Sequence, residues 1–252
     1  ATGLYRIKQP TLAAIGIGSI PAEQFQLWRN GEQVPLYTTV QTGVMGGSDY
    51  IEFWGERNDG KPDQALYRVA DYQLNDRYSL ETDTASFFLT INPVIANNLR
   101  LAPASNSLPT ALPVEPYFMH TMGIYYRNKI NLGFAAVVGS NVYSSAFDSG
   151  EGWTSSDIGT GGTRTETFAN LNPYTGVDAP NPSLKVNVTG NGQNPRQVEL
   201  KVNSTQVALQ TMDFFDYVRI NTPLTVAQIS SGTATIQVVN RCITPSDRIA
   251  IA

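Results

Sequence analysis

The stretch Val198–Leu209, VELKVNSTQVAL, decides the fold class of this chain. Apolar residues stand at every second position on both sides of an Asn203-Ser204 pair, which is the period of two half-buried β-strands joined by a turn. Similar runs recur in the second half at Leu184–Val188, Phe215–Arg219, Ile236–Val238 and Ile249–Ile251. No long segment has the 3.6-residue period of a helix. The pattern predicts a β-sandwich or a jelly roll.

The first half also has strand patterns, and one of them contains a strong hairpin signal. An Asn30-Gly31 pair separates two alternating runs, and this pair favours the tight turn of a β-hairpin. Further strands are expected at Leu4–Lys8, Phe25–Arg29, Tyr50–Trp54 and Ser86–Ile91, with one short helical turn at Thr11–Ile15.

Between Asn92 and Pro116 five prolines fall among small and polar residues, a composition typical of a linker or long connection. We therefore predict an all-β chain with little helix, made of two sandwich or jelly-roll-like subdomains. The first subdomain is expected to comprise residues 1–110 and the second residues 111–252.

Composition narrows the functional class. The chain has 252 residues, of which 41% are hydrophobic and 15% charged, and its net charge is −4. Such a chain is long enough to bury a real core and too apolar to be disordered. Its acidic balance argues against a nucleic-acid partner. No apolar run approaches the ~18 residues of a membrane span.

The two ends carry an expectation about the parent protein. The chain begins Ala1-Thr2-Gly3 without a methionine and ends on the strand-like run Arg248–Ala252. Because natural termini are usually frayed and polar, we expect that a longer polypeptide was divided after Ala252.

Reactive side chains are few. His120 is the only histidine and Cys242 the only cysteine, so an intrachain disulfide is impossible, and a zinc site of soft ligands is nearly excluded. Neither residue has an exposed glycine-rich loop beside it, and both are expected to be structural. Gly16–Ser19 lacks the pattern of a phosphate loop and reads as a turn. We expect no catalytic residue in this chain.

Carboxylates offer two further hypotheses. A hydrolase would need two acidic residues facing each other across a cleft, and no spacing singles out such a pair. Candidates for it are Glu115, Asp148, Glu151, Asp157 and Glu166. Asp59 and Asp63, on either side of Gly60, resemble part of a calcium loop, although the complete pattern is absent. The alternative is that these are turn residues that bond their own backbone.

Aromatic residues give the most specific binding hypothesis. Trp153, Tyr143 and Tyr125 could form a platform on which sugar rings stack, or they could pack in the interior, where large aromatics contribute most burial. Trp153 stands next to glycine in Gly150-Glu151-Gly152-Trp153, as a loop anchor often does. The first reading makes the chain a carbohydrate-binding module.

The segment Ile51–Asn92 carries a family resemblance, together with a few motifs outside it. It resembles the N-terminal region of gingipain-type cysteine peptidases, in particular the sortase-like proteins of the type IX secretion system of Bacteroidetes. The motifs are Gly3–Ile7, Ile51–Glu56, Asn58–Gly60, Asp63, Leu66-Tyr67, Asn75, Tyr78–Leu80, Thr82–Thr84, Phe88–Thr90, Gly150–Trp153 and Ser246–Arg248. The resemblance spans most of the chain and is densest between residues 51 and 92.

The resemblance implies a context rather than an activity. In that family this region precedes a caspase-like domain with a catalytic His and Cys, and His120 and Cys242 do not match those motifs. It thus implies a non-catalytic accessory region of a protein that is extracellular or on the outer-membrane surface. Such a region would scaffold or orient a downstream peptidase domain, or bind other surface proteins or glycans. The alternative is a carbohydrate-binding β-sandwich of a cell-surface protein.

Overall fold

The computed structural model describes residues 1–105, 114–133, 135–138, 140–143 and 147–252, and for residues 135–138 and 140–143 it describes the backbone alone. Its contacts divide the chain into two compact units. The first unit comprises residues 1–58 and 82–113, and the second comprises residues 59–81 and 114–252. Residues 59–81 thus group with the later part of the chain, whereas the sequence analysis placed them in the first subdomain.

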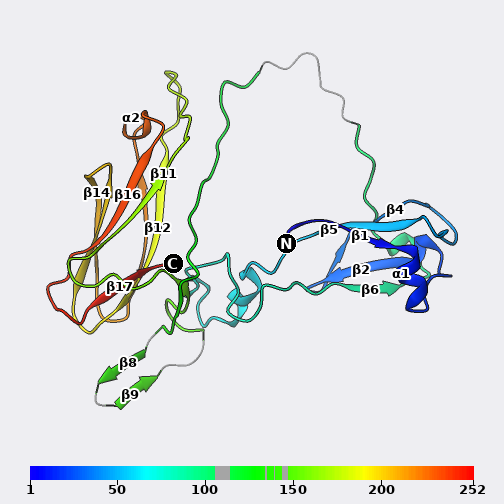
Figure 1. Ribbon diagram of the computed structural model, residues 1–252, viewed down its shortest axis with the longest axis horizontal. Helices are drawn as coiled ribbons and strands as arrows, with labels where there is room; N and C mark the ends of the chain where they lie inside the picture. Colours follow the sequence, from blue (N-terminus) through cyan, green and yellow to red (C-terminus); the bar gives the residue numbers. More distant parts are fainter. Residues whose placement is uncertain (106–113, 134, 139, 144–146) are drawn as a thin grey trace. The chain divides into compact units, whose positions relative to one another are not determined.

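The first unit is a small β-structure of two three-stranded antiparallel sheets (Figure 1). One sheet has the order β1-β5-β4 and the other β3-β2-β6. The strands are β1 (Gly3–Lys8), β2 (Phe25–Arg29), β3 (Glu32–Val34), β4 (Tyr37–Thr38), β5 (Tyr50–Gly55) and β6 (Phe88–Ile91). Phe25 and Leu27 of one sheet and Ile51 and Phe53 of the other are buried in one core, so the inner faces of the two sheets supply it.

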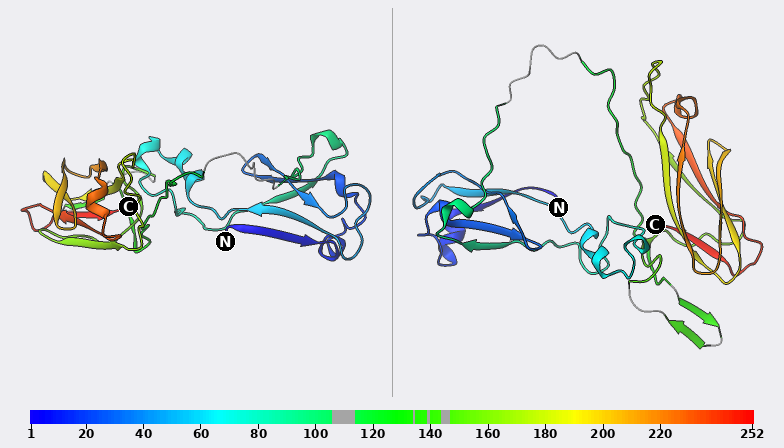
Figure 2. Two further views of the ribbon diagram at one scale, coloured as in Figure 1. Left: turned by 90° about the horizontal axis from the view of Figure 1, so that it is seen from above. Right: turned by 180° about the vertical axis from the view of Figure 1, so that it is seen from behind.

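Short helices complete the first unit. The α-helix α1 (Gln9–Ala14) follows β1 directly, with Pro10 in its first turn (Figure 2), where a missing N–H costs nothing. Of two 3₁₀-helices, η1 (Ala22–Gln24) precedes β2 and η4 (Ile95–Asn97) follows β6. The predicted hairpin is confirmed: Arg29 pairs with Glu32, and both Asn30 and Gly31 have positive φ, as the tight turn requires.

The second unit is a β-sandwich. A four-stranded antiparallel sheet has the order β11-β16-β13-β14, and a three-stranded one has the order β15-β12-β17. Their strands are β11 (Thr163–Phe168), β12 (Ser183–Asn191), β13 (Arg196–Val202), β14 (Thr205–Met212), β15 (Tyr217–Pro223), β16 (Ala234–Asn240) and β17 (Arg248–Ile251). Apart from the β13–β14 hairpin, successive strands alternate between the two sheets. Since most of the regular structure in both units is antiparallel β-sheet, the predicted all-β fold is confirmed.

The alternating residues that predicted the sandwich form its core. Val188 and Ile249 of one sheet and Val198, Leu200 and Val238 of the other lie in a single buried cluster. Asn203 and Ser204 both have positive φ and close the β13–β14 turn where the sequence predicts it. The core therefore rests on period-2 burial on the two facing sheets.

Smaller elements surround the sandwich. They are the 3₁₀-helices η2 (Lys61–Leu66) and η3 (Ala70–Tyr72), the hairpin of β8 (Ala135–Val138) and β9 (Ser140–Tyr143), the pair of β7 (Lys129–Asn131) and β10 (Gly152–Thr154), and the short α-helix α2 (Val226–Ile229). Within the described residues, no helix is long and apolar enough to span a membrane.

Candidate functional site

Residues 59–81 form a fixed part of the second unit. The Tyr67 hydroxyl donates a hydrogen bond to the carbonyl of Glu151 at 2.8 Å, and the Asn187 side chain donates one to the carbonyl of Leu74 at 2.7 Å. Arg219 donates to the carbonyl of Gln73 at 2.8 Å. These bonds run from side chains to main-chain groups far away in sequence, so they fix the path of a segment that has little regular structure of its own.

A glycine explains one family-like motif within this segment. Gly60 has a φ of 88°, and a Cβ at this position would lie 2.7 Å from the carbonyl oxygen of Tyr78. Only glycine therefore fits the close approach of these two parts of the segment. The Asn58-Asp59-Gly60 motif is accounted for by this turn.

The predicted calcium residues are engaged with protein groups. Asp59 forms an ion pair with Lys61 at 2.9 Å. Burial would raise the pKa of the Asp59 carboxyl, but the hydrogen bonds from Lys61 outweigh it and the pKa is lowered. Asp63 is 5% exposed and accepts hydrogen bonds from the Ser79 hydroxyl at 3.1 Å and the Leu80 N–H at 2.9 Å. Within the described residues, no three His, Cys, Asp or Glu side chains gather as a metal site.

This arrangement predicts the effect of Asp63→Asn. An amide would point an N–H₂ group toward one of two donors, so we expect a loss of about 1–3 kcal/mol of unfolding free energy. Thermal unfolding with and without millimolar calcium chloride measures the effect. The loss should be the same in both buffers, and the control Asp76→Asn, at an exposed carboxylate, should change little. A calcium-dependent stabilisation that disappears only in the Asp63 variant would instead show a calcium site.

Two of the three aromatic rings predicted to stack on sugars each have an arginine side chain beside the ring. The Trp153 indole N–H donates to the carbonyl of Ser79 at 2.9 Å, and the Arg127 guanidinium lies 4.9 Å from the centre of its ring. Tyr125 is 40% exposed, with the Arg77 guanidinium 5.0 Å from its ring. Tyr143 lies in β9, whose side chains are outside the described residues. Sugar stacking by these rings remains a prediction.

The two candidate nucleophile–base residues have different environments. Cys242 is 5% exposed, and its thiol lies 3.2 Å from a carboxylate oxygen of Asp247 and 3.6 Å from the carbonyl oxygen of Thr244. His120 is exposed in a segment without regular secondary structure. The buried thiol is thus part of a local hydrogen-bond network, which is consistent with a structural role.

Four of the five acidic residues considered for hydrolysis have local partners, and the fifth, Glu115, is exposed. Arg164 donates to Glu166 at 2.7 Å and the Tyr126 hydroxyl donates to it at 2.9 Å. Burial would raise the pKa of the Glu166 carboxyl, but these hydrogen bonds outweigh it and the pKa is lowered. A general acid needs the opposite shift. Glu151 accepts a hydrogen bond from the N–H of Asp148 at 2.9 Å.

A groove lined by both polar and apolar side chains lies in the second unit. It has a volume of about 650 Å³ and is formed by β7 and the residues after it, the segment after β10, the end of β12 with the loop behind it, and the start of β17. The segment after β10 runs beside β17, because the N–H groups of Ser155 and Ile158 donate to the carbonyls of Ile251 and Ile249, both at 2.8 Å. Main-chain bonding thus fixes the position of the residues between them.

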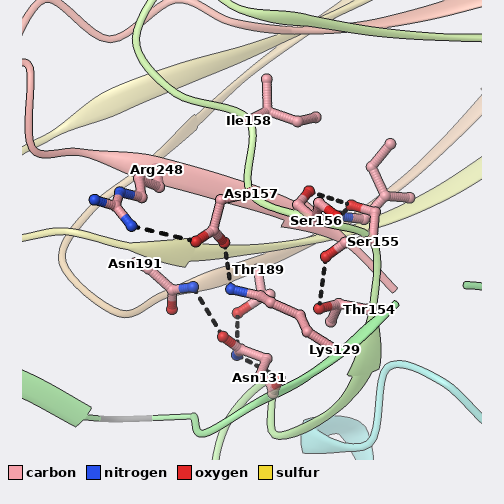
Figure 3. A network of polar contacts seen from close by, with 12 residues as sticks. Lys129, Asn131, Thr154, Ser155, Ser156, Asp157, Ile158, Thr189, Asn191 and Arg248 are labelled. Carbon is pink, nitrogen blue, oxygen red and sulfur yellow. Dashed lines mark hydrogen bonds and ion pairs between the residues drawn. The ribbon is translucent and has the colours of Figure 1, made fainter. Parts of the chain in front are cut away.

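Two cations share one carboxylate in this groove. Lys129 of β7 pairs with Asp157, and the Arg248 guanidinium lies 3.5 Å from the second carboxylate oxygen of Asp157 (Figure 3). The exposed fractions of the three side chains are 33%, 26% and 58% in the order Lys129, Asp157 and Arg248. Exposed ion pairs of this kind contribute little to the stability of the fold. Their charged groups instead define what the groove can bind.

A second set of contacts fixes side-chain amides beside this triad. Asn131 is 3% exposed and donates to the carbonyl of Gly150 at 2.8 Å. Its own side-chain oxygen accepts a hydrogen bond from Asn191 at 2.8 Å (Figure 3). Asn191 pairs with Arg248 in the register of β12 and β17. The buried Asn131 amide therefore holds the half-buried Asn191 amide at the groove, on the strand position paired with Arg248.

The groove wall rests on a buried charged pair. Asp247 is fully buried and accepts hydrogen bonds from the Gln193 N–H at 3.2 Å and the Asn194 side chain at 3.3 Å. Arg196, 2% exposed, donates to the carbonyl of Phe214, while its Nε and Nη1 atoms have no hydrogen-bond partner among the described residues. Burial lowers the pKa of the Arg196 guanidinium, and the Asp247 carboxylate opposes that shift.

A second glycine is required by this charged pair. A Cβ at Gly192 would lie 2.3 Å from a carboxylate oxygen of Asp247 and 2.5 Å from Nη1 of Arg196. The main chain of the groove wall therefore passes directly over both buried charges. This close approach fixes the loop that carries Gln193 and Asn194.

Sequence reasoning did not find this groove. It named Asp157 only as one of several scattered carboxylates, and it treated Ser246-Asp247-Arg248 only as a family-like motif. The Lys129, Asn131 and Asn191 side chains stand in no recognisable spacing, because strands far apart in sequence bring them together. The one signal of the groove in the sequence is that Lys129 and Asn131, two residues apart, lie on the same side of a short strand.

Comparisons with known proteins show similarity in structure only. No family model matches the chain, and no curated protein matches it. Dimeric latent PorU from Porphyromonas gingivalis is similar over 100% of this chain and 23% of its own, with 11% identity and a TM-score of 0.46. The chain thus spans about a quarter of the PorU chain that it resembles.

Carbohydrate-binding modules are also similar. A CBM36 module in complex with calcium and xylotriose is similar over 49% of this chain and 87% of its own, with 12% identity and a TM-score of 0.29. The CBM36-1 domain of a multidomain xylanase from the hindgut metagenome of Trinervitermes trinervoides has the same identity and TM-score, over 38% of this chain and 70% of its own. These likenesses are too weak to assign a function to this chain.

Proposed function

We propose that this chain is a non-catalytic accessory region of a larger secreted protein, and that its second unit binds a ligand or partner in the groove. The observation that carries the proposal is the groove itself, where Lys129, Asp157 and Arg248 hold one another beside amides anchored by buried Asn131. A concave site in which a few fixed polar groups lie beside apolar side chains is typical of a binding site.

The surroundings of the groove favour binding over catalysis. Each carboxylate oxygen of Asp157 is engaged by a cation. Cys242, the only thiol, is buried against Asp247. A region of this kind would scaffold or orient a downstream peptidase domain of the resembled family, at the cell surface or outside the cell.

The test is turnover by the isolated chain. Wild-type protein and a Cys242→Ala variant are incubated with a panel of peptide substrates, and cleavage is followed by mass spectrometry. We expect no cleavage by either protein. Because Cys242 is buried, circular dichroism must show that the variant is folded. Turnover that the substitution abolishes would contradict a non-catalytic role.

Carbohydrate binding is the second candidate, and the groove provides a specific observation in its favour. Its wall offers donors on Lys129 and Arg248 together with acceptors on Asp157 and the side-chain amides. A sugar hydroxyl both donates and accepts hydrogen bonds, so a mixed set suits it. A glycan array with the wild-type chain tests this candidate, and an array without signal would remove it.

A further inference from the structure

The charge balance of the groove limits what it can bind. Asp247 is fully buried, close to the buried Arg196, and Asp157 is shared by two cations. The four charged side chains that line the groove sum to zero, but with Asp247 buried the exposed ones are two cations and one carboxylate. In a partly enclosed site such an excess attracts anions more strongly than it would in open water.

Arg248 has the geometry to use this excess. Its side chain is 58% exposed, and its single contact with Asp157 is long, at 3.5 Å. A guanidinium has five N–H donors in a planar fork that matches a carboxylate with two parallel hydrogen bonds. One edge of the fork therefore remains available to a carboxylate from a ligand, while Asp157 keeps the head group in place.

Next to this cation, the groove presents groups that fit hydroxyls. Asn191 uses its N–H₂ group on Asn131, and Asn194 uses its own on Asp247. The side-chain oxygens of Asn191 and Asn194 have no hydrogen-bond partner in the part of the chain that the structure describes. Gln193 is exposed between them. These acceptors would have nothing to bind in a small inorganic anion, and they fit a ligand that also carries O–H groups.

An apolar wall completes the set. Ile130 and Leu132, on either side of Asn131, are 40% and 60% exposed, and both line the groove. Sugar rings have apolar C–H faces that such side chains can cover. A peptide that adds to a sheet needs a free strand edge, and β17, which carries Arg248, has β12 on one side and residues 155–158 on the other.

From these contacts we propose that the groove binds a saccharide that carries a carboxylate, with Arg248 as the residue that receives the carboxylate. This inference rests on the proposed binding function and narrows it to one ligand class, acidic sugars such as uronic acids.

The test compares matched ligands by titration calorimetry on the full chain at low salt. The probes are a galacturonic acid trisaccharide, the neutral galactose trisaccharide and a tripeptide of glutamate. We expect the acidic saccharide to bind about 10–100-fold more tightly than the neutral one, which is the range for hydrogen bonds to a charged group. The glutamate tripeptide should bind more weakly than the acidic saccharide.

Variants assign the effect to the groove. Arg248→Ala should weaken binding of the acidic saccharide by the same ~10–100-fold and leave any neutral binding unchanged, while Arg248→Lys should restore part of it. The matched control is Arg241→Ala, because Arg241 is 50% exposed and pairs with Glu199 outside the groove. It should leave the affinity unchanged. Circular dichroism checks that each variant is folded.

The outcomes separate this inference from the proposed function. Equal affinity for the acidic and neutral saccharides would overturn the role of the carboxylate and leave carbohydrate binding in place. Equal affinity for the glutamate tripeptide would overturn the assignment to a saccharide. If no probe binds to the folded chain, the inference is overturned, whereas the non-catalytic role fails only if the chain cleaves a substrate.

Discussion

Replacing Asn240 by aspartate lowers the unfolding free energy by about 3–5 kcal/mol at neutral pH. Asn240 is fully buried, and its N–H₂ group donates to the carbonyls of Ile158 at 3.0 Å and Asp247 at 3.2 Å. Its side-chain oxygen accepts the N–H of Cys242 at 3.0 Å. A carboxylate there would face two carbonyl oxygens without a counter-charge, and an uncompensated buried charge has a cost of this size.

The loss should depend on pH in a known direction. Since burial disfavours the charged form, the pKa of the introduced carboxyl is raised in the folded state. Below the pKa of an unfolded aspartate, roughly 4, the carboxyl is protonated in both states. At such pH the unfolding free energy of the variant is closest to that of the wild type. The stability then falls as the pH rises through the higher folded pKa.

Urea unfolding at several pH values measures the effect of the Asn240 substitution. The matched control is Asn221→Asp, the same change at an exposed position of β15, where we expect a change within about 0.5 kcal/mol. Equal effects at both positions, or a loss that does not shrink toward acidic pH, would contradict the role assigned to Asn240. Because Asn240 joins residues 158 and 247 behind the groove, the variant should also weaken any binding there.

Replacing Leu200 by alanine should cost about 2–5 kcal/mol. Leu200 is fully buried in the core between the two sheets of the second unit, and removing its side chain loses both burial and contacts while leaving a cavity. Leu209→Ala is the matched control, because Leu209 lies on the neighbouring strand β14 and is 46% exposed. It should cost well under half as much in the same urea titration. Similar losses at both positions would contradict the assignment of the inner face.

Much of the fold could be predicted because it follows from local sequence rules. The period-2 runs specify which face of each strand is buried, and the Asn30-Gly31 and Asn203-Ser204 pairs adopt the positive φ that two-residue turns need. These features depend on residues that are close together in sequence. The strands and turns were therefore predictable. The order of the strands in the sheets depends on pairings between strands far apart in sequence, and it was not predicted.

Residues 59–81 show what local reasoning cannot reach. Their polar side chains read as turn residues or calcium ligands, yet Asp63 accepts hydrogen bonds from Ser79 and Leu80, and Tyr67 bonds a carbonyl 84 residues away. The partners of a loop without regular structure are set by tertiary contacts.

The groove was missed because its residues share no motif. Lys129, Asp157 and Arg248 lie in three separate segments, and only the pairing of the Ser155–Ile158 segment with β17 brings the last two together. The excess of cations among the exposed charges of the groove is likewise invisible in a chain whose net charge is −4. A site built from solitary residues on different strands becomes apparent only when the sheet register is known.

The most direct test of the central claim, that the groove is the binding surface of this chain, is an amide NMR map of the wild-type protein titrated with the galacturonic acid trisaccharide. We predict shifts confined to residues 129–133, 155–158, 191–194 and 246–248, which surround the groove. Shifts centred instead on Tyr125 and Trp153, or no shifts at millimolar saccharide, would contradict it.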